Sequence, residues 1–195
     1  LRVIKKDSDT KQTVLVPNAE FKIFNIDKNE YVKQYTTYPS KVEHTSFFTD
    51  DDGDLILPEA LKIGNYRIEE VSAPYGYVVN DKYVSISVDT DTAFETDGDT
   101  NDAIITVEYS DAPAVGELTV EKKGEVLDGF KGGLFANSED KEFVYKEGSL
   151  AGAVFKVYAA EDIFTADNQK DADGNRIKYY SKGDLVATLT TGKDG

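Results

Sequence analysis

Side chains along this chain alternate between apolar and polar with a period of two residues, and helical spacing is nearly absent. The alternation is clearest over residues 1–6, 21–24, 84–88 and 105–111. Because successive side chains of a strand point to opposite faces, each run predicts a strand with one face on a core. Acidic turns that contain glycine, such as 50–54, separate these runs. The pattern predicts an all-β sandwich, a class of fold in which Greek-key connections are usual.

Composition excludes several kinds of chemistry. The 195 residues include no Cys, Met or Trp and one His, His44, which argues against disulfides, thiol chemistry and His-based metal sites or triads. The formal net charge of −15 favours solubility and repels nucleic acid and anionic membranes. No apolar run approaches membrane-spanning length, and nothing in the sequence resembles a signal peptide. Because the chain starts directly on a strand-like pattern, we expect an excised fragment. The sequence predicts no cofactor, no metal, no nucleic acid partner and no membrane contact.

The chain contains an internal repeat. Three segments of the first half each resemble a later one: 1–6 resembles 118–123, 16–21 resembles 150–155, and 49–53 resembles 191–195. The growing offset places an insertion at 125–149, which we expect to be an extra hairpin or interdomain brace, with a ligand-binding loop as the alternative. Asp111–Gly116 is expected to be a linker. We therefore predict one complete domain over 1–113 and the N-terminal part of a second, incomplete domain over 114–195.

The most specific motif lies in residues 61–77, which follow the pattern L-x-x-G-x-Y-x-x-x-E-x-x-A-P-x-G-Y. Together with Lys5-Lys6-Asp7, Ala19-Glu20-Phe21 and Asp111-Ala112-Pro113, it resembles the Cna-B/SpaA-type domains of Gram-positive pilins and adhesins. All four elements occur in the family order across 1–113. The resemblance implies a prealbumin-like (reverse immunoglobulin) sandwich located outside the cell, on the bacterial cell wall.

Domains of this family often contain a spontaneous amide (isopeptide) bond between a Lys and an Asn or Asp, assisted by a Glu. The resemblance implies that Lys5 is the amine, Asp111 the acceptor and Glu70 the catalytic helper. Glu69, on the opposite strand face, is expected to be a solvated bystander. Lys122 is the matching lysine of the second copy; its partners would lie beyond Gly195, so we expect it to be unpaired unless another chain complements it.

The alternation supports these assignments independently. Lys5 continues the inward face of Val3, Asp111 continues that of Tyr109, and Glu70 shares a face with Ile68. Ionisable side chains on apolar faces are costly unless paired. Burial generally lowers the pKa of an amine and raises that of a carboxyl group, which favours attack of a neutral amine on a protonated acid. An ordinary buried salt-bridge cluster remains the alternative.

These features predict a structural stalk module of a cell-wall adhesin or pilin, whose partners are other domains of the same surface protein. Its only chemistry would be autocatalytic amide formation, so we do not expect an enzyme. Binding of a host protein or glycan is the alternative function, and an ancillary domain of a secreted enzyme is a third. A binding module is expected to have a concave aromatic or polar patch near 27–50 or 125–149. The acidic loop that starts at Asp171 has Lys182, rather than Glu, at the twelfth position of a Ca²⁺ loop, and predicts no metal site.

Overall fold

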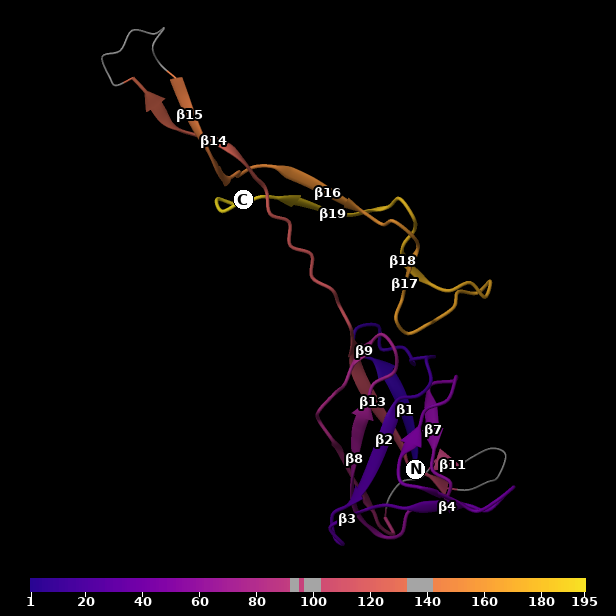
Figure 1. Cartoon of the computed structure of the whole chain (residues 1–195). Helices are drawn as coiled ribbons and strands as arrows, with labels where there is room; N and C mark the ends of the chain where they lie inside the picture. Colours follow the sequence, from indigo (N-terminus) through magenta and orange to yellow (C-terminus); the bar gives the residue numbers. More distant parts are fainter. Residues whose placement is uncertain (92–94, 97–102, 133–141) are drawn as a thin grey trace. The chain divides into compact units, whose positions relative to one another are not determined.

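The computed structural model describes residues 1–91, 95–96, 103–132 and 142–195 (Figure 1). These residues form two compact units: Leu1–Val115 with Phe164–Ile177, and Gly116–Ile163 with Lys178–Gly195. The sequence analysis assigned 164–177 to the second domain, whereas the structure groups it with the first unit. That 114–195 belongs to a second domain of the same family stays a prediction. No helix long and apolar enough to cross a membrane occurs among the described residues.

Two sheets form the first unit. One has the order β7-β1-β13-β9, and the other has the order β10-β8-β2-β3, with β6 paired to β2. The first sheet contains β7 (Asp54–Ile56), β1 (Arg2–Asp7), β13 (Thr106–Pro113) and β9 (Tyr77–Val78). The second contains β10 (Val84–Val88), β8 (Gly64–Ser72), β2 (Glu20–Asn25), β3 (Glu30–Tyr31) and β6 (Phe47–Phe48). β1 and β13, near the two ends of the unit, are paired in parallel.

The core lies between these two sheets. β1 and β2 each bury every second residue, as the period-two alternation predicted. The rings of Phe21 in β2 and Tyr109 in β13 are 5.1 Å apart in an edge-on contact, so the two sheets pack face to face. The buried apolar residues are Val3, Ala19, Phe21, Ile23, Phe47, Leu55, Leu57, Tyr66, Ile68, Val88, Val107 and Tyr109. The predicted all-β sandwich is confirmed.

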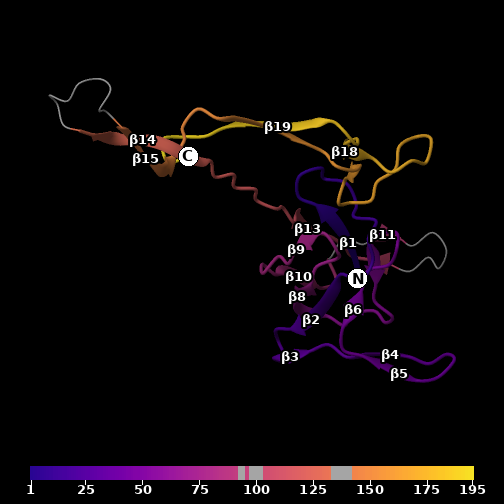
Figure 2. The same ribbon diagram turned by 45° about the horizontal axis from the view of Figure 1, so that its top comes forward.

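Two short strand pairs lie outside this sandwich. β4 (Gln34–Thr36) and β5 (Val42–His44) form an antiparallel ribbon that extends away from the sheets in Figure 2. β11 (Glu95–Thr96) pairs with β12 (Ala103–Ile104), and the residues that connect them lie outside the described part of the chain.

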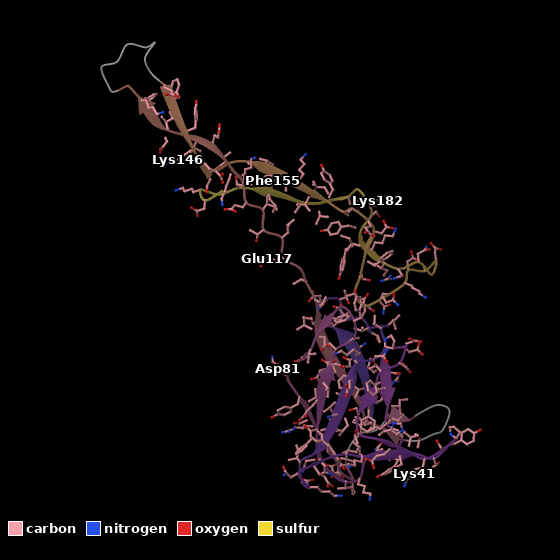
Figure 3. The ribbon with its side chains drawn as sticks, viewed as in Figure 1. Lys41, Asp81, Glu117, Lys146, Phe155 and Lys182 are labelled. Atoms are coloured by element: carbon pink, nitrogen blue, oxygen red, sulfur yellow. The ribbon has the colours of Figure 1, made fainter. Side chains whose placement is uncertain are left out.

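The second unit consists of strand pairs. β14 (Lys123–Lys131) and β15 (Glu142–Ser149) form an antiparallel hairpin, which confirms a hairpin in the predicted insertion at 125–149; residues 133–141 lie outside the description. β16 (Val154–Tyr158) pairs with β19 (Leu185–Thr190), and β17 (Ile163–Phe164) pairs with β18 (Lys178–Tyr180). Phe155, labelled in Figure 3, projects from the β16 ribbon.

The expected first strand of the second copy is absent from the described chain. Residues 116–122 have no strand structure, and β14 begins only at Lys123. β1, its counterpart, is hydrogen-bonded to β13 on one edge and β7 on the other. Residues 118–121 have no such neighbours among the described strands, and an isolated segment does not hold an extended conformation by itself.

The 164–177 segment is attached to the first unit by polar contacts with the loop that follows β1. The Leu15 N–H donates to the Asp167 carbonyl oxygen at 2.9 Å, and the Thr10 hydroxyl donates to the Asp167 carboxylate at 3.1 Å. The Gln169 side-chain amide donates to the Thr13 carbonyl oxygen at 2.7 Å. Asp167 is 2% exposed, so this segment is a packed part of the unit.

Candidate crosslinking site

Three strands bring the predicted site residues to one place in the core. Lys5 lies on β1 opposite Tyr109 of the parallel strand β13, so Asp111 is two residues further along the same face. Glu70 lies on β8, in the facing sheet, beside Phe21 of β2. All three side chains are fully buried, and their predicted inward orientation is confirmed.

The Lys5 amine sits between two carboxylates. Its Nζ is 2.5 Å from Asp111 Oδ1 and 2.8 Å from Glu70 Oε1. Aromatic rings close the remaining sides, with Nζ 4.7 Å from the ring centre of Tyr109 and 5.7 Å from that of Phe21. The two rings therefore line the buried amine together with the carboxyl groups.

These close contacts are ion pairs, but their angles are not those of good hydrogen bonds. Within the described chain, no hydrogen bond of acceptable geometry reaches four buried atoms: Lys5 Nζ, Glu70 Oε1 and both carboxylate oxygens of Asp111. A buried ion pair regains the desolvation cost of its charges only when its geometry is good and further hydrogen bonds satisfy the remaining polar atoms. Three fully buried ionisable side chains that meet at one amine are therefore a candidate functional site.

Burial changes the acidity of the acceptor. It raises the pKa of Asp111 to about 7, because desolvation of the carboxylate outweighs the nearby Lys5 amine, which lowers it. The negative charge of Glu70 adds to the increase. Near neutral pH, the Asp111 carboxyl group is therefore protonated in an appreciable fraction of molecules. Amide formation requires this protonated form, because its hydroxyl group can leave as water.

Asp7, a buried acid on β1, has a different environment from Asp111. Asp7 is fully buried and pairs in register with Asp111. One of its oxygens accepts the N–H groups of Asp9 and Thr10, at 2.8 and 2.9 Å, and the other accepts the Tyr77 hydroxyl at 2.7 Å. The hydrogen bonds of Asp7 thus cap the turn after β1, and Asp111, rather than Asp7, is the aspartate that contacts the Lys5 amine.

The remaining predicted residues lie apart from this cluster. Glu69 is on the opposite face of β8, as predicted, but it is not simply solvated: it accepts the Tyr31 hydroxyl at 2.8 Å and pairs with Arg67. Lys122 is exposed, in the second unit, and its assignment as an unpaired crosslinking lysine stays a prediction.

The acidic loop near Asp171 forms a turn. The Asp171 carboxylate accepts the N–H groups of Asp173 and Asn175, at 3.0 and 2.9 Å. No group of three or more Asp, Glu, His or Cys residues is placed to hold a metal ion within the residues that the structure describes.

The sequence analysis missed two neighbours of the cluster. The backbone N–H of Asn80 donates to Glu70 Oε2 at 2.9 Å, and the Tyr109 hydroxyl contacts the carbonyl groups of Asn80 and Lys82. Tyr109 had been assigned only to the core face. Its hydroxyl group was the available signal, since a buried tyrosine hydroxyl usually needs a hydrogen-bond partner.

Two face-to-face sheets, with the first and last strands of the unit paired in parallel, define a prealbumin-like β-sandwich. Residues 1–103 match the family described as SpaA, prealbumin-like fold domain. The chain belongs to this family, as the sequence resemblance predicted.

The solved structures to which the chain is similar include three bacterial proteins. The pilus 2b backbone protein of group B streptococcus is 22% identical to this chain, with a TM-score of 0.43. The match covers 57% of this chain and 40% of the pilus protein's chain. The shaft pilin SpaA from Lactobacillus rhamnosus GG is 21% identical, with a TM-score of 0.41, and the match covers 60% of this chain and 48% of the pilin chain. The Bacillus anthracis TIE protein is 21% identical, with a TM-score of 0.43, and the match covers 100% of this chain and 25% of the TIE chain. The chain therefore spans less than half the length of each. A comparison with curated protein sequences found no significant match.

Proposed function

We propose that the first unit is a stalk module of a cell-wall pilin or adhesin, closed by an amide bond between Lys5 Nζ and Asp111 Cγ. Membership of the SpaA family supports a structural role and a location on the outside of a Gram-positive cell. Neighbouring domains of the same surface protein are the proposed partners. The module turns over no substrate, because its reaction consumes its own side chains once.

The observation that carries this proposal is the fully buried Lys5 amine, which lies 2.5 Å from Asp111 Oδ1 and 2.8 Å from Glu70 Oε1. An ordinary salt-bridge cluster of this depth would retain the desolvation cost of three ionisable groups. Amide formation replaces the amine and one carboxyl group with a neutral group. Only Glu70 then remains as an acid, with one oxygen already hydrogen-bonded to Asn80.

The reaction follows from the geometry. Neutral Lys5 Nζ attacks Cγ of the protonated Asp111 carboxyl group, and one Nζ proton passes to Glu70 Oε1, 2.8 Å away. Glu70 then returns this proton to the departing hydroxyl, the C–O bond breaks, and one water leaves. Because the strands hold both reactants in contact, the effective concentration can be on the order of 10⁵ M or more.

The location of the bond explains why it would stabilise the unit. It joins the first and last strands and encloses residues 6–110. A crosslink that closes a loop of about 100 residues stabilises by roughly 4–5 kcal/mol, mainly by restricting the unfolded chain. Most domains have a total stability of roughly 5–15 kcal/mol.

Intact mass spectrometry of the folded 195-residue chain tests the proposal. We expect a mass one water below the sequence mass, and a branched peptide that joins Lys5 to Asp111 after digestion. Lys5→Met, which removes the amine but keeps an apolar stem, should have its full sequence mass. A full sequence mass for the wild-type chain would contradict the amide.

Glycan binding is the second candidate function, and a groove of ≈ 660 Å³ in the first unit favours it. Its lining includes Tyr31, Tyr35, Lys28, Lys33 and Lys62, from segments 25–35 and 59–66. Part of it lies in the 27–50 region, where a binding module was expected to have a concave patch. Aromatic faces that can stack on sugar rings, with polar groups around them, are typical of ligand sites.

A glycan array that compares carboxylated with neutral glycans tests this second function. Lys62→Ala should weaken binding of carboxylated glycans, whereas Lys156→Ala, at an exposed position of the second unit, should not. Array signals at background for the wild-type chain would exclude glycans as the ligand of the groove.

A further inference from the structure

One residue outside the reacting trio contacts two parts of the site. The Asn80 backbone N–H donates to Glu70 Oε2 at 2.9 Å, and its side-chain amide donates to the carbonyl oxygen of Ser110 at 2.9 Å. Ser110 immediately precedes Asp111 on β13. Asn80 therefore links the proposed helper on one sheet to the strand that carries the acceptor on the other.

Tyr109 holds the segment in which Asn80 lies. Its hydroxyl is 3.0 Å from the Asn80 carbonyl oxygen and in contact with that of Lys82, while its ring lies beside Lys5 Nζ. Asp81, labelled in Figure 3, marks this segment, which connects β9 to β10 and has no strand structure of its own. Burial raises the pKa of Tyr109 to about 12, so its hydroxyl remains a donor at neutral pH.

These contacts assign different tasks to the two oxygens of Glu70. Oε2 is held by Asn80, and Oε1 faces the Lys5 amine at 2.8 Å. A free glutamate side chain rotates about three bonds, so its carboxylate would face the amine for only part of the time. Proton transfer requires a direct approach, and misplacement of a reacting group by about 1 Å can cost on the order of 100-fold in rate.

We propose that Asn80 and Tyr109 are positioning residues for amide formation: they hold Glu70 by Oε2 and keep Oε1 directed at Lys5. Neither residue exchanges a proton or forms a bond in the reaction. This inference rests on the proposed crosslink between Lys5 and Asp111. It adds that the connection between β9 and β10 must be in place for the reaction to proceed at its full rate.

The test measures the rate of water loss by intact mass after refolding of the full chain, starting when circular dichroism has reached its native value. Tyr109→Phe keeps the ring beside the amine and removes only the O–H. We expect this variant to lose water at least about tenfold more slowly than the wild-type chain. Asn80→Ala keeps the N–H that holds Glu70 and removes the bond to Ser110, so it should slow the reaction less.

Tyr31→Phe is the matched control, because the Tyr31 hydroxyl donates to Glu69 on the outer face of the same sheet. It should react at the wild-type rate. A purely structural role for Tyr109 would lower the melting temperature but leave the rate in the folded state unchanged.

The outcomes separate this inference from the proposed function. A wild-type chain that never loses water overturns both. A wild-type chain that loses water, with Tyr109→Phe and Asn80→Ala equally fast, overturns only the positioning roles. If Tyr109→Phe does not fold, the rate for Asn80→Ala decides.

Discussion

Glu69 and Glu70 are adjacent in the sequence and lie in opposite environments, because alternate residues of β8 face outward and inward. Glu70 contacts the Lys5 amine in the core, whereas Glu69 binds Tyr31 and Arg67 on the outer face. We expect Glu70→Ala to fold but keep its full sequence mass, because no base accepts the amine proton. Glu69→Ala should lose one water like the wild-type chain. Intact masses that are equal for the two variants would refute the assignment of the proton shuttle.

The raised pKa of Asp111 predicts that the stability of the uncrosslinked protein depends on pH, and that the proposed crosslink removes this dependence. In Lys5→Met, which cannot crosslink, folded Asp111 keeps a pKa of about 7 or higher, against an ordinary value of 3.8 in the unfolded chain. The folded state then binds more protons than the unfolded state between these values, so stability falls as pH rises from about 4 to about 7. The expected loss is on the order of 4 kcal/mol.

Urea unfolding at several pH values between 4 and 8 measures this effect. Other acids titrate in both proteins, so the informative quantity is the difference between Lys5→Met and the wild-type chain, whose Asp111 carboxyl group the proposed crosslink would consume. Parallel stability curves for the two proteins would show that Asp111 does not titrate in this range.

At the scale of strands, the alternation of side chains predicted more than any single motif. It predicted β1, β2, β10 and β13 and the inward faces of Lys5, Glu70 and Asp111, because burial on a sheet has a period of two. The family resemblance then predicted which buried ionisable residues belong together.

Other contacts could not be predicted from the pattern. Asn80 holds Glu70 through a backbone N–H, a group that every residue except proline has. The 164–177 segment docks through polar side chains such as Asp167, which a sequence pattern assigns to solvent. Residues 118–121 have strand-like alternation, but whether a strand forms depends on neighbours that a local pattern does not specify.

Substitution of a buried residue in the 164–177 segment should change the local protection of backbone amides from hydrogen exchange. Asp167→Ala removes the carboxylate that accepts the Thr10 hydroxyl and leaves a cavity at a buried position. We expect the amide of Leu15, which donates to the Asp167 carbonyl oxygen, to exchange faster by the equivalent of about 1–3 kcal/mol. Hydrogen exchange resolved by residue measures this change.

Asp171→Ala, which removes a carboxylate in the exposed turn of the same segment, is the control and should leave Leu15 protected. Exchange in β2 should be unchanged in both variants. Unchanged exchange at Leu15 in Asp167→Ala would mean that the segment does not contribute to the first unit.

For the whole molecule, the crosslink predicts a large effect of one substitution. Lys5→Ala cannot form the proposed amide and should lower the melting temperature by about 10 °C or more, with part of that loss due to packing around the lysine stem. Lys6→Ala, whose side chain is on the other face of β1 and contacts Thr13 and Glu108, should change it by only a few degrees at most. Calorimetry that gives equal melting temperatures for the two variants would refute the stabilising role.

The two units should differ in resistance to proteases. Among the described residues of the second unit, Ala159 is the only buried hydrophobic side chain, and Val154 and Tyr158 are more than half exposed, at 62% and 54%. We expect limited proteolysis to cut within 118–195 first, apart from the docked 164–177 segment, and to leave 1–113 intact. Early cuts within 1–113 with survival of 118–195 would contradict the proposed stalk.

The parallel pairing of β1 and β13 has a consequence for tension. Residues 2 and 113 lie at opposite ends of the sheet, so a pull on the two ends of the unit runs along the strands. With the amide in place, the load passes from residue 5 directly to residue 111, and the roughly 100 residues between them are not under strain. Their release would add slack on the order of 350 Å, at about 3.3–3.6 Å per residue. A surface fibre built from such links would keep a constant length, and the loops between residues 6 and 110 could change in sequence without changing how far it reaches.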